Sequence, residues 1–214
     1  MFITLEGVEG CGKSTHLRLL SEWLEAQGVA HTVTREPGGT SFGAGIRALL
    51  VNPAAEEVAP LCELLLYVAD RAQHVARLLA PKLAAGELVL SDRFSDATLA
   101  YQGWGRGLDR ATVRQLNELA CQGLKPDLTL LLDCEPETGL ARARRRAQGL
   151  AAGVSAEDRF EREELEFHRR VRQGYLALAR EEPGRIRVID SGGPVAGVQG
   201  RLRAVVAERL GLKL

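Results

Sequence analysis

Short apolar runs alternate with longer segments of helical periodicity along this chain of 214 residues. The apolar runs occupy residues 1–5, 31–34, 88–91, 128–133 and 185–190. This alternation predicts an α/β fold, a five-stranded parallel sheet with right-handed crossover helices on both faces. The run at 128–133 is almost continuously apolar, which is typical of a central strand covered on both faces. Because ligands bind beyond the carboxyl ends of parallel strands, we expect the functional residues at that edge of the sheet.

Two helices are marked by their capping residues as well as by periodicity. Asp109 is a good N-cap for a helical run that continues to Cys121, and Gly123 follows just beyond that run. A second helix is expected at 135–137, where acidic residues flank an early proline. No linker or internal repeat interrupts the pattern, so residues 1–214 are predicted to form a single domain.

The segment after the first apolar run fits the phosphate-binding pattern G-x-x-x-x-G-K-S/T. It consists of Gly7, Val8, Glu9, Gly10, Cys11, Gly12, Lys13 and Ser14. Glycines let successive backbone N–H groups turn toward phosphate oxygens, and the next helix adds its positive N-terminal end. Lys13 is expected on the outer phosphates, and the Ser14 hydroxyl on Mg²⁺. The motif predicts a nucleotide phosphate site, but by itself it does not separate a kinase from a switch.

The overall composition suits a compact globular protein and narrows its partners. Lysine and arginine number 28, aspartate and glutamate also number 28, and the formal net charge is zero. This balance argues against a general nucleic-acid or membrane-surface binder. No apolar run approaches the roughly 20 residues of a membrane span, and Met1 leads directly into a strand rather than a signal peptide, so we expect a cytoplasmic location.

The cysteines are too widely scattered for a shared site. They are Cys11, Cys62, Cys121 and Cys134. No C-x-x-C pair or Cys/His cluster occurs, so the sequence indicates neither a zinc site nor a disulfide framework, and buried thiols are expected.

Asp92 and Arg93 follow the third apolar run, which places them at the same sheet edge as the phosphate loop. Asp92 is expected to hold Mg²⁺, directly or through water, while Arg93 grips a phosphoryl group with its fork of donors. A surface ion pair is the alternative, and the strand-end position favours the functional interpretation. The polar turn at 34–40 follows the second strand in the same way and is interpreted as a substrate loop.

Residues 148–155 are small and poorly patterned between two charged helical segments, and they predict a lid at about 143–158. Gly149 and Gly153 are its predicted hinges. The residues Arg142, Arg144, Arg145 and Arg146 precede it. A basic segment that closes over transferring phosphates can accelerate transfer, although for most of these arginines a solvated helix face is the simpler interpretation.

Five ordered blocks occur along the chain. They are LEGVEGCGKST at 5–15, REPGGT at 35–40, DRF at 92–94, AYQG at 100–103 with GRG at 105–107, and PDLT at 126–129. Together they resemble the thymidylate kinases, enzymes that phosphorylate dTMP with ATP. The resemblance covers nearly the whole chain. It implies the fold of a P-loop nucleoside monophosphate kinase, with ATP as phosphoryl donor, Mg²⁺ as cofactor and a homodimeric assembly.

The resemblance also implies a role for individual residues around the two nucleotides. The phosphate loop and Thr15 would bind ATP, with Arg142 near the adenine. The dTMP phosphate would be held by Arg47, Arg71 and Arg93. Spacing alone would not select Arg47 or Arg71, because isolated arginines on helices are usually solvated. Glu36 would lie near the acceptor phosphate and Mg²⁺.

The same resemblance assigns residues to the thymine and the sugar of dTMP. Tyr67 would lie against the thymine ring, and Thr98 and Gln102 would meet the edge of the base. Tyr101 would crowd the position of a ribonucleotide 2′-hydroxyl, and Glu9 would contact the 3′-hydroxyl. Ordinary core packing remains the alternative for both tyrosines.

The catalytic arginine is expected outside the phosphate loop. Some members of the family carry a basic residue in that loop, whereas this chain has Glu9 and Cys11 there. It therefore resembles the bacterial type, in which the lid supplies the arginine that assists Lys13 and Arg93. Arg146 is the first candidate and Arg144 the second, because the lid is longer than expected and leaves the register open.

Two other functions fit the phosphate loop. One is a kinase for another nucleoside monophosphate or a small metabolite. The other is a nucleotide-dependent switch or binding module, although the guanine-reading sequence Asn-Lys-x-Asp is absent and the D-x-x-G match at 190–193 follows the fifth strand, too late for a switch. For the expected homodimer, periodicity does not decide whether the apolar series faces the core or a partner. That series is Leu61, Leu64, Leu65 and Val68.

Overall fold

The sheet at the centre of the computed structural model confirms all five predicted strands. The model describes residues 1–52, 57–148 and 159–213. The strands are β1 (Phe2–Glu6), β2 (His31–Arg35), β3 (Leu88–Asp92), β4 (Leu128–Asp133) and β5 (Ile186–Asp190). They pair in parallel in the order β2-β3-β1-β4-β5. β1 is buried throughout and β4 almost throughout, which agrees with their continuous apolar sequences.

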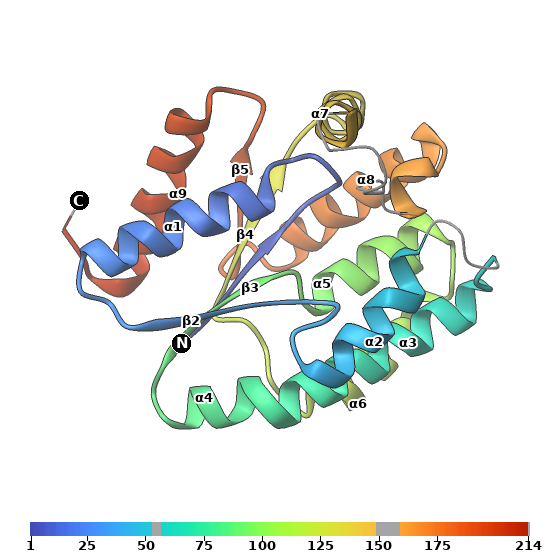
Figure 1. Ribbon diagram of the computed structural model, residues 1–214, viewed down its shortest axis with the longest axis horizontal. Helices are drawn as coiled ribbons and strands as arrows, with labels where there is room; N and C mark the ends of the chain where they lie inside the picture. Colours follow the sequence, from blue (N-terminus) through green and yellow to red (C-terminus); the bar gives the residue numbers. More distant parts are fainter. Residues whose placement is uncertain (53–56, 149–158, 214) are drawn as a thin grey trace.

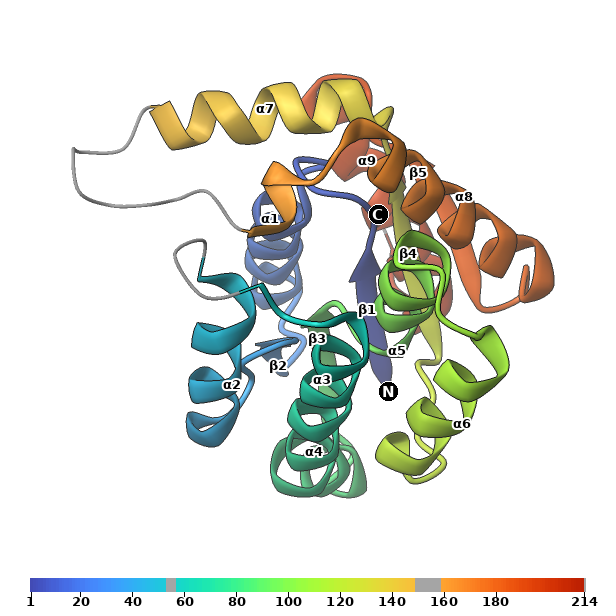
Figure 2. The ribbon, with the colours of Figure 1, turned by 90° about the vertical axis from the view of Figure 1, so that its right-hand side faces the viewer.

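Helices fill the crossovers between these strands (Figure 1). The α-helices are α1 (Lys13–Ala26), α2 (Ser41–Val51), α3 (Pro60–His74), α4 (Ala80–Ala84), α5 (Ser95–Thr98), α6 (Arg110–Cys121), α7 (Pro136–Gln148), α8 (Leu165–Glu181) and α9 (Val195–Leu210). Two π-helical segments, η1 (Val75–Leu79) and η2 (Leu99–Gly105), and the 3₁₀ turn η3 (Arg159–Arg162) complete the elements. Figure 2 shows the sheet between α1 on one side and α8 on the other.

The two helices predicted from capping residues are confirmed. The Asp109 carboxylate accepts a hydrogen bond of 2.9 Å from the Thr112 backbone N–H at the start of α6. α7 begins at Pro136, where its fixed φ angle and missing N–H suit a first helical position.

The strand register brings the predicted polar residues to one edge of the sheet. Asp92 pairs with Leu5 of β1 on one side and with Arg35 of β2 on the other. The phosphate loop leaves β1 one residue after this level, so it and Asp92 meet at the carboxyl edge, as parallel pairing requires.

The cysteines only partly follow the expectation of buried thiols. Cys11, Cys121 and Cys134 are buried, whereas Cys62 is exposed on the first turn of α3, where its position on the helix faces solvent. That expectation was therefore wrong for Cys62. Within the described ranges, no helix combines the length and the apolar character needed to cross a bilayer.

Candidate active site

The phosphate loop takes a shape that its glycines permit. Gly10 has a φ of 68°, and a Cβ placed there would lie 1.8 Å from the carbonyl oxygen of Gly139 in α7. Gly12, with a φ of 98°, is the N-cap of α1. An L side chain would clash at the first position and be strained at both. The loop therefore packs close to α7 and leads into α1, whose first N–H groups have no partner within the helix and suit an anion.

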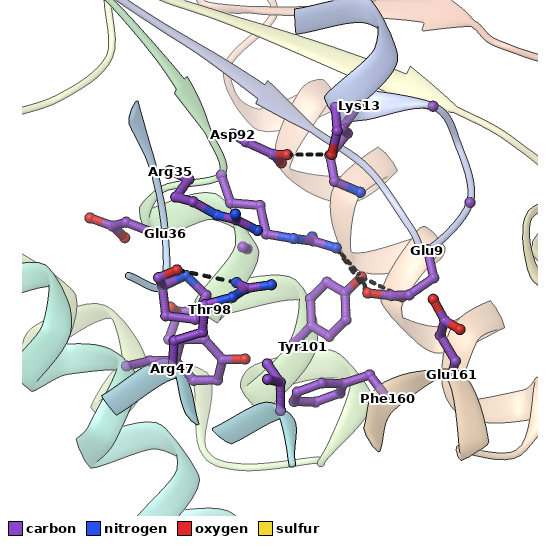
Figure 3. Close-up of a pocket in the computed structure, with 18 of the residues that line it drawn as sticks. Glu9, Lys13, Arg35, Glu36, Arg47, Asp92, Thr98, Tyr101, Phe160 and Glu161 are labelled. Carbon is purple, nitrogen blue, oxygen red and sulfur yellow. Dashed lines mark hydrogen bonds and ion pairs between the residues drawn. The ribbon is translucent and has the colours of Figure 1, made fainter. Parts of the chain in front are cut away.

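Lys13 and Ser14 lie at the start of α1 beside this loop. The Lys13 ammonium donates to the carbonyl oxygens of Gly7, at 3.0 Å, and Val8, at 2.9 Å. The Ser14 hydroxyl donates to a carboxylate oxygen of Asp92 at 3.0 Å (Figure 3). A hydroxyl and a carboxylate this close together form an oxygen-rich pair of the kind that Mg²⁺ prefers.

Arg93 is fixed by hydrogen bonds from two of its nitrogens. Nη1 donates to the Gly7 carbonyl oxygen at 3.0 Å and to the Tyr175 hydroxyl at 3.1 Å. Nη2 donates to Glu9 Oε1 at 2.9 Å and to the Tyr101 hydroxyl at 3.0 Å. Its φ of 75° is unusual for a residue with a side chain, and such strain persists where surrounding contacts over-determine the conformation. The guanidinium is therefore positioned in advance at the floor of the site.

Glu9 belongs to the same network. The Tyr101 hydroxyl lies 2.7 Å and 2.6 Å from the two oxygens of the Glu9 carboxylate and donates its single hydrogen there. Burial favours a higher pKa for Glu9, but the charges of Arg93 and Lys13 outweigh it and hold the pKa well below its usual range. Burial also raises the pKa of Tyr101 well above its ordinary value. The pair is an ionised carboxylate beside a neutral phenol.

Glu36 is held by a buried network behind the turn at 34–40. Arg71 donates to Glu36 Oε2 from Nε at 2.9 Å, and the His74 Nδ1 lies 2.8 Å from Oε1. Asp70 accepts from the Gly38 backbone N–H at 3.1 Å. Burial, and secondarily the charge of Glu36, raise the pKa of Asp70 to about 6. This network fixes the turn at 34–40 against α3.

These elements surround a cavity of about 200 Å³. Its cations are Lys13, Arg35, Arg47 and Arg93, and its acids are Glu9, Glu36, Asp92 and Glu161. In Figure 3 Lys13 and Asp92 lie at one end of this space, and Phe160 and Arg47 lie at the other. Cations from four separate segments converge where anionic phosphates would meet the phosphate loop.

The opposite end of the cavity has a different character. Tyr67 and Phe160 line it with rings 6.4 Å apart at 53°, and Phe160 also packs edge-on against Tyr101 at 5.7 Å. The Thr98 hydroxyl lines the same end, is buried, and has no hydrogen-bond partner in the described part of the chain. Gln102 also lines the cavity, and its side chain is buried. Aromatic walls with two uncharged polar groups suit a planar heterocycle.

Comparison with known proteins adds independent support to this geometry. The family model described as thymidylate kinase matches residues 5–201. The chain belongs to the thymidylate kinase family. It is 55% identical over 207 residues to the thymidylate kinase of Desulfosudis oleivorans, covering 96% of each chain. It is also 51% identical over 210 residues to that of Trichlorobacter lovleyi, covering 98% of each.

A solved structure of the same family confirms the predicted kinase fold. The crystal structure of thymidylate kinase from Ehrlichia chaffeensis superposes with a TM-score of 0.74 at 33% identity, covering 96% of this chain and 98% of that one. The predicted resemblance to thymidylate kinases is thus confirmed over nearly the whole chain.

Most residues that the resemblance to thymidylate kinases selected line the cavity, but Arg71 and Arg142 are among those that do not. Arg71 is only 1% exposed. Besides Glu36, it donates to the Asn117 side chain and the Phe94 carbonyl oxygen, so it supports Glu36 from the protein interior. Arg142 donates instead to the carbonyl oxygens of the loop after β5, at Ser191 and Gly192. Their direct nucleotide contacts stay predictions.

The structure describes only part of the predicted lid. Arg144 is exposed on α7, which also carries Arg146 in its backbone. The Arg146 side chain and residues 149–158, with the hinge candidates Gly149 and Gly153, lie outside the described residues. The site also contains residues to which neither pattern nor resemblance assigned a role. These are Arg35, Phe160, Glu161 and Tyr175. Arg35 begins the REPGGT block, which was the available signal, whereas Phe160, Glu161 and Tyr175 lie in none of the five blocks.

Proposed function

We propose that this protein transfers the γ-phosphoryl group of ATP to dTMP and forms dTDP and ADP. The observation that carries the proposal is a single cavity with two unlike ends. Lys13 and Ser14 of the phosphate loop lie at one end, and Tyr67, Thr98 and Gln102 line the other, which suits a planar heterocycle. The names of the family and of its curated members support dTMP as the acceptor.

The reaction requires positioning and charge neutralisation rather than a strong base. An oxygen of the dTMP phosphate attacks the γ-phosphorus, the bond to the bridging oxygen breaks, and ADP leaves with that electron pair. The acceptor is already anionic near neutral pH, so the protein must align two anions and exclude water. Lys13 would contact the transferring phosphates, and Arg93 and Arg47 the acceptor phosphate.

The residues at the sheet edge fit a magnesium ion held mainly by phosphates. Ser14 and Asp92 offer a hydroxyl and a carboxylate 3.0 Å apart. Mg²⁺ is usually held by one or two such groups together with substrate phosphates and water. When bound, the ion would neutralise charge that develops on the phosphoryl oxygens. Glu36 would lie near the ion without binding it directly, because its two carboxylate oxygens already bond to Arg71 and His74.

Selectivity for a deoxyribonucleotide is assigned to Tyr101 and Glu9. The Tyr101 hydroxyl is tied to Glu9 and Arg93, so the ring is not free to move away from an added 2′-hydroxyl. A fixed obstacle of this kind rejects a ribonucleotide by steric exclusion. Glu9, held ionised, is a strong acceptor for the sugar 3′-hydroxyl.

The lid arginine and the dimer complete the proposal. Arg146 on α7 is the first candidate for the arginine that neutralises transition-state charge, with Arg144 second. A homodimer is proposed from exposed apolar side chains on the neighbouring helices α2 and α3. These are Phe42, Leu49, Leu61 and Leu65. Leu64 of the predicted series is buried and belongs to the core. Light scattering that gives a monomeric mass at working concentration would count against the dimer.

An acceptor screen tests the proposed reaction against its two alternatives. ADP formation from ATP and Mg²⁺ is measured alone and with dTMP, dUMP, dCMP, dGMP or dAMP. Rapid ADP formation with dTMP is expected. Slow hydrolysis that no acceptor stimulates would indicate a switch, and strong stimulation by a different acceptor would indicate another kinase.

A further inference from the structure

The side-chain amide of Gln102 is held in one of its two possible orientations by a neighbouring residue. A side-chain amide offers a donor on one side and an acceptor on the other, and it can present either to a ligand. Here the Gln102 nitrogen donates to Glu63 Oε1 at 2.8 Å. The carbonyl oxygen of the same amide accepts no hydrogen bond from any described residue, and Gln102 lines the cavity. The acceptor is therefore left to the ligand.

Glu63 enforces this orientation because it is a buried acceptor. Its carboxylate has no exposed surface and lies on the first turn of α3. Arg106 donates to both of its oxygens, from Nε at 3.2 Å and from Nη2 at 3.1 Å. This fits an ionised carboxylate, which has lone pairs but no hydrogen to offer. If the Gln102 amide were reversed, its carbonyl oxygen would face Glu63, and two buried acceptors would oppose each other.

Arg106 is fixed in turn, so the arrangement is rigid. Its Nη2 pairs with Glu163 at 2.6 Å, and its guanidinium lies over the Phe167 ring at 4.8 Å. Glu63 therefore cannot follow Gln102 into another arrangement without breaking its ion pair with Arg106, in which the carboxylate is fully buried. Removing a partner from such a group is costly.

An acceptor at this position distinguishes two classes of pyrimidine. N3 of thymine and uracil carries a hydrogen and donates, whereas N3 of cytosine has a lone pair and accepts. The Gln102 carbonyl oxygen would bond the first and repel the second. The Thr98 hydroxyl donates or accepts by rotation, so it suits the O4 of thymine and the amino group of cytosine equally and cannot separate them.

We propose that Glu63, locked by Arg106, is a specificity-determining residue that orients Gln102 and makes the site select 4-keto pyrimidines over cytosine. Glu63 is a positioning residue, because it acts through the Gln102 amide and lies outside the cavity lining. The inference rests on the proposed function, since it takes the heterocycle end of the cavity to be the dTMP base site.

Substitution of Glu63 by glutamine tests this orientation with little change in shape. A glutamine at 63 has one carbonyl oxygen, and the two donors of Arg106 compete for it. The Gln102 nitrogen competes for the same oxygen, and the amide at 63 can turn its own nitrogen toward Gln102. Gln102 is then no longer held in one orientation and can present its nitrogen to the ligand. We expect the ratio of dissociation constants for dCMP and dTMP to fall by about tenfold or more, through weaker dTMP binding and stronger dCMP binding.

The measurement is isothermal titration of dTMP and dCMP against the wild type and Glu63→Gln, with Glu57→Gln as matched control. Glu57 is exposed and precedes α3, so the same chemical change there should leave the ratio unchanged. In a Gln102→Ala background, Glu63→Gln should no longer alter the ratio. A purely structural role for Glu63 would weaken both ligands together and would persist in that background.

The outcomes separate this inference from the proposed function. A Glu63→Gln ratio within twofold of the wild type overturns the inference. If circular dichroism shows that this variant does not fold, Glu63→Asp, which keeps the charge for Arg106 but retracts from Gln102, is judged by the same criterion. Failure of the wild type itself to bind or phosphorylate dTMP would contradict the proposed function, and that result appears without any variant.

Discussion

Replacing Glu6 with glutamine should change how the stability of the protein depends on pH. Glu6 ends β1, and its carboxylate is completely buried. One oxygen accepts from the Phe94 backbone N–H at 2.7 Å, and the other accepts from the Tyr175 hydroxyl at 2.8 Å. Burial, followed by the charge of Asp96, raises the pKa of Glu6 to about 8, and the nearby Arg93 offsets only part of this.

The direction of the stability change with pH follows from the pH at which the folded and unfolded states each release the Glu6 proton. The unfolded chain loses the Glu6 proton near the ordinary pKa of 4.5, whereas the folded protein keeps it until about pH 8. The folded state therefore binds more protons between these values, and stability decreases as pH rises through that window. The total decrease from this one group is at most about 5 kcal/mol, at 1.36 kcal/mol for each pH unit of the window. Glutamine is neutral throughout, so its variant lacks this slope.

Urea unfolding followed by tryptophan fluorescence measures the effect. The free energy of unfolding is compared for the wild type and Glu6→Gln at about pH 5.5 and about pH 7.5. Other titrating groups largely cancel in the difference between the two proteins. The variant should gain about 2 to 3 kcal/mol relative to the wild type over this interval. A difference that stays constant within about 0.5 kcal/mol would refute a raised pKa for Glu6.

Three further substitutions probe the site itself. Asp92→Asn should lower kcat by about 10² or more, because it removes the carboxylate beside Ser14 that is proposed to hold Mg²⁺; a coupled ADP assay at several Mg²⁺ concentrations checks this, and unchanged kcat would remove Asp92 from that role. Arg146→Ala should reduce kcat by about 10³ while hardly raising the KM for dTMP, and near-normal turnover would exclude it as the lid arginine. Tyr175→Phe should lower the free energy of unfolding by about 2 to 3 kcal/mol, because Arg93 loses one acceptor and a buried carboxylate loses its donor; denaturation at pH 9 checks this, and wild-type stability there would contradict the network.

Structural features that depend on residues close together in the chain could be predicted from the sequence. The phosphate loop needs only its own glycines, the lysine and serine that follow, and a strand before it. Asp109 caps a helix that starts at the next residue. The apolar runs predicted all five strands, because strands buried on both faces leave no polar alternation to obscure them. Because parallel strands share one carboxyl edge, the same pattern also predicted that Asp92 lies beside the loop.

Contacts between distant residues could not be predicted in the same way. Tyr175 bonds to Glu6 across 169 positions of the chain, and nothing local in either sequence indicates the other. Arg71 illustrates the same limit. The family resemblance marked it as a nucleotide ligand, and in the structure its donors bond to protein groups in the interior, so its direct nucleotide contact stays a prediction. Whether an arginine faces a cavity or the core depends on packing between helices, which periodicity does not resolve.

The initial rate of ADP formation with ATP and Mg²⁺, with and without dTMP, tests the central claim most directly. Two anions must be bound together in the cavity before transfer occurs, so water alone is a poor acceptor in the absence of dTMP. We predict that saturating dTMP raises the rate at least about a hundredfold and that dTDP appears in equal amount to ADP. An ADP rate that dTMP leaves unchanged would contradict the account.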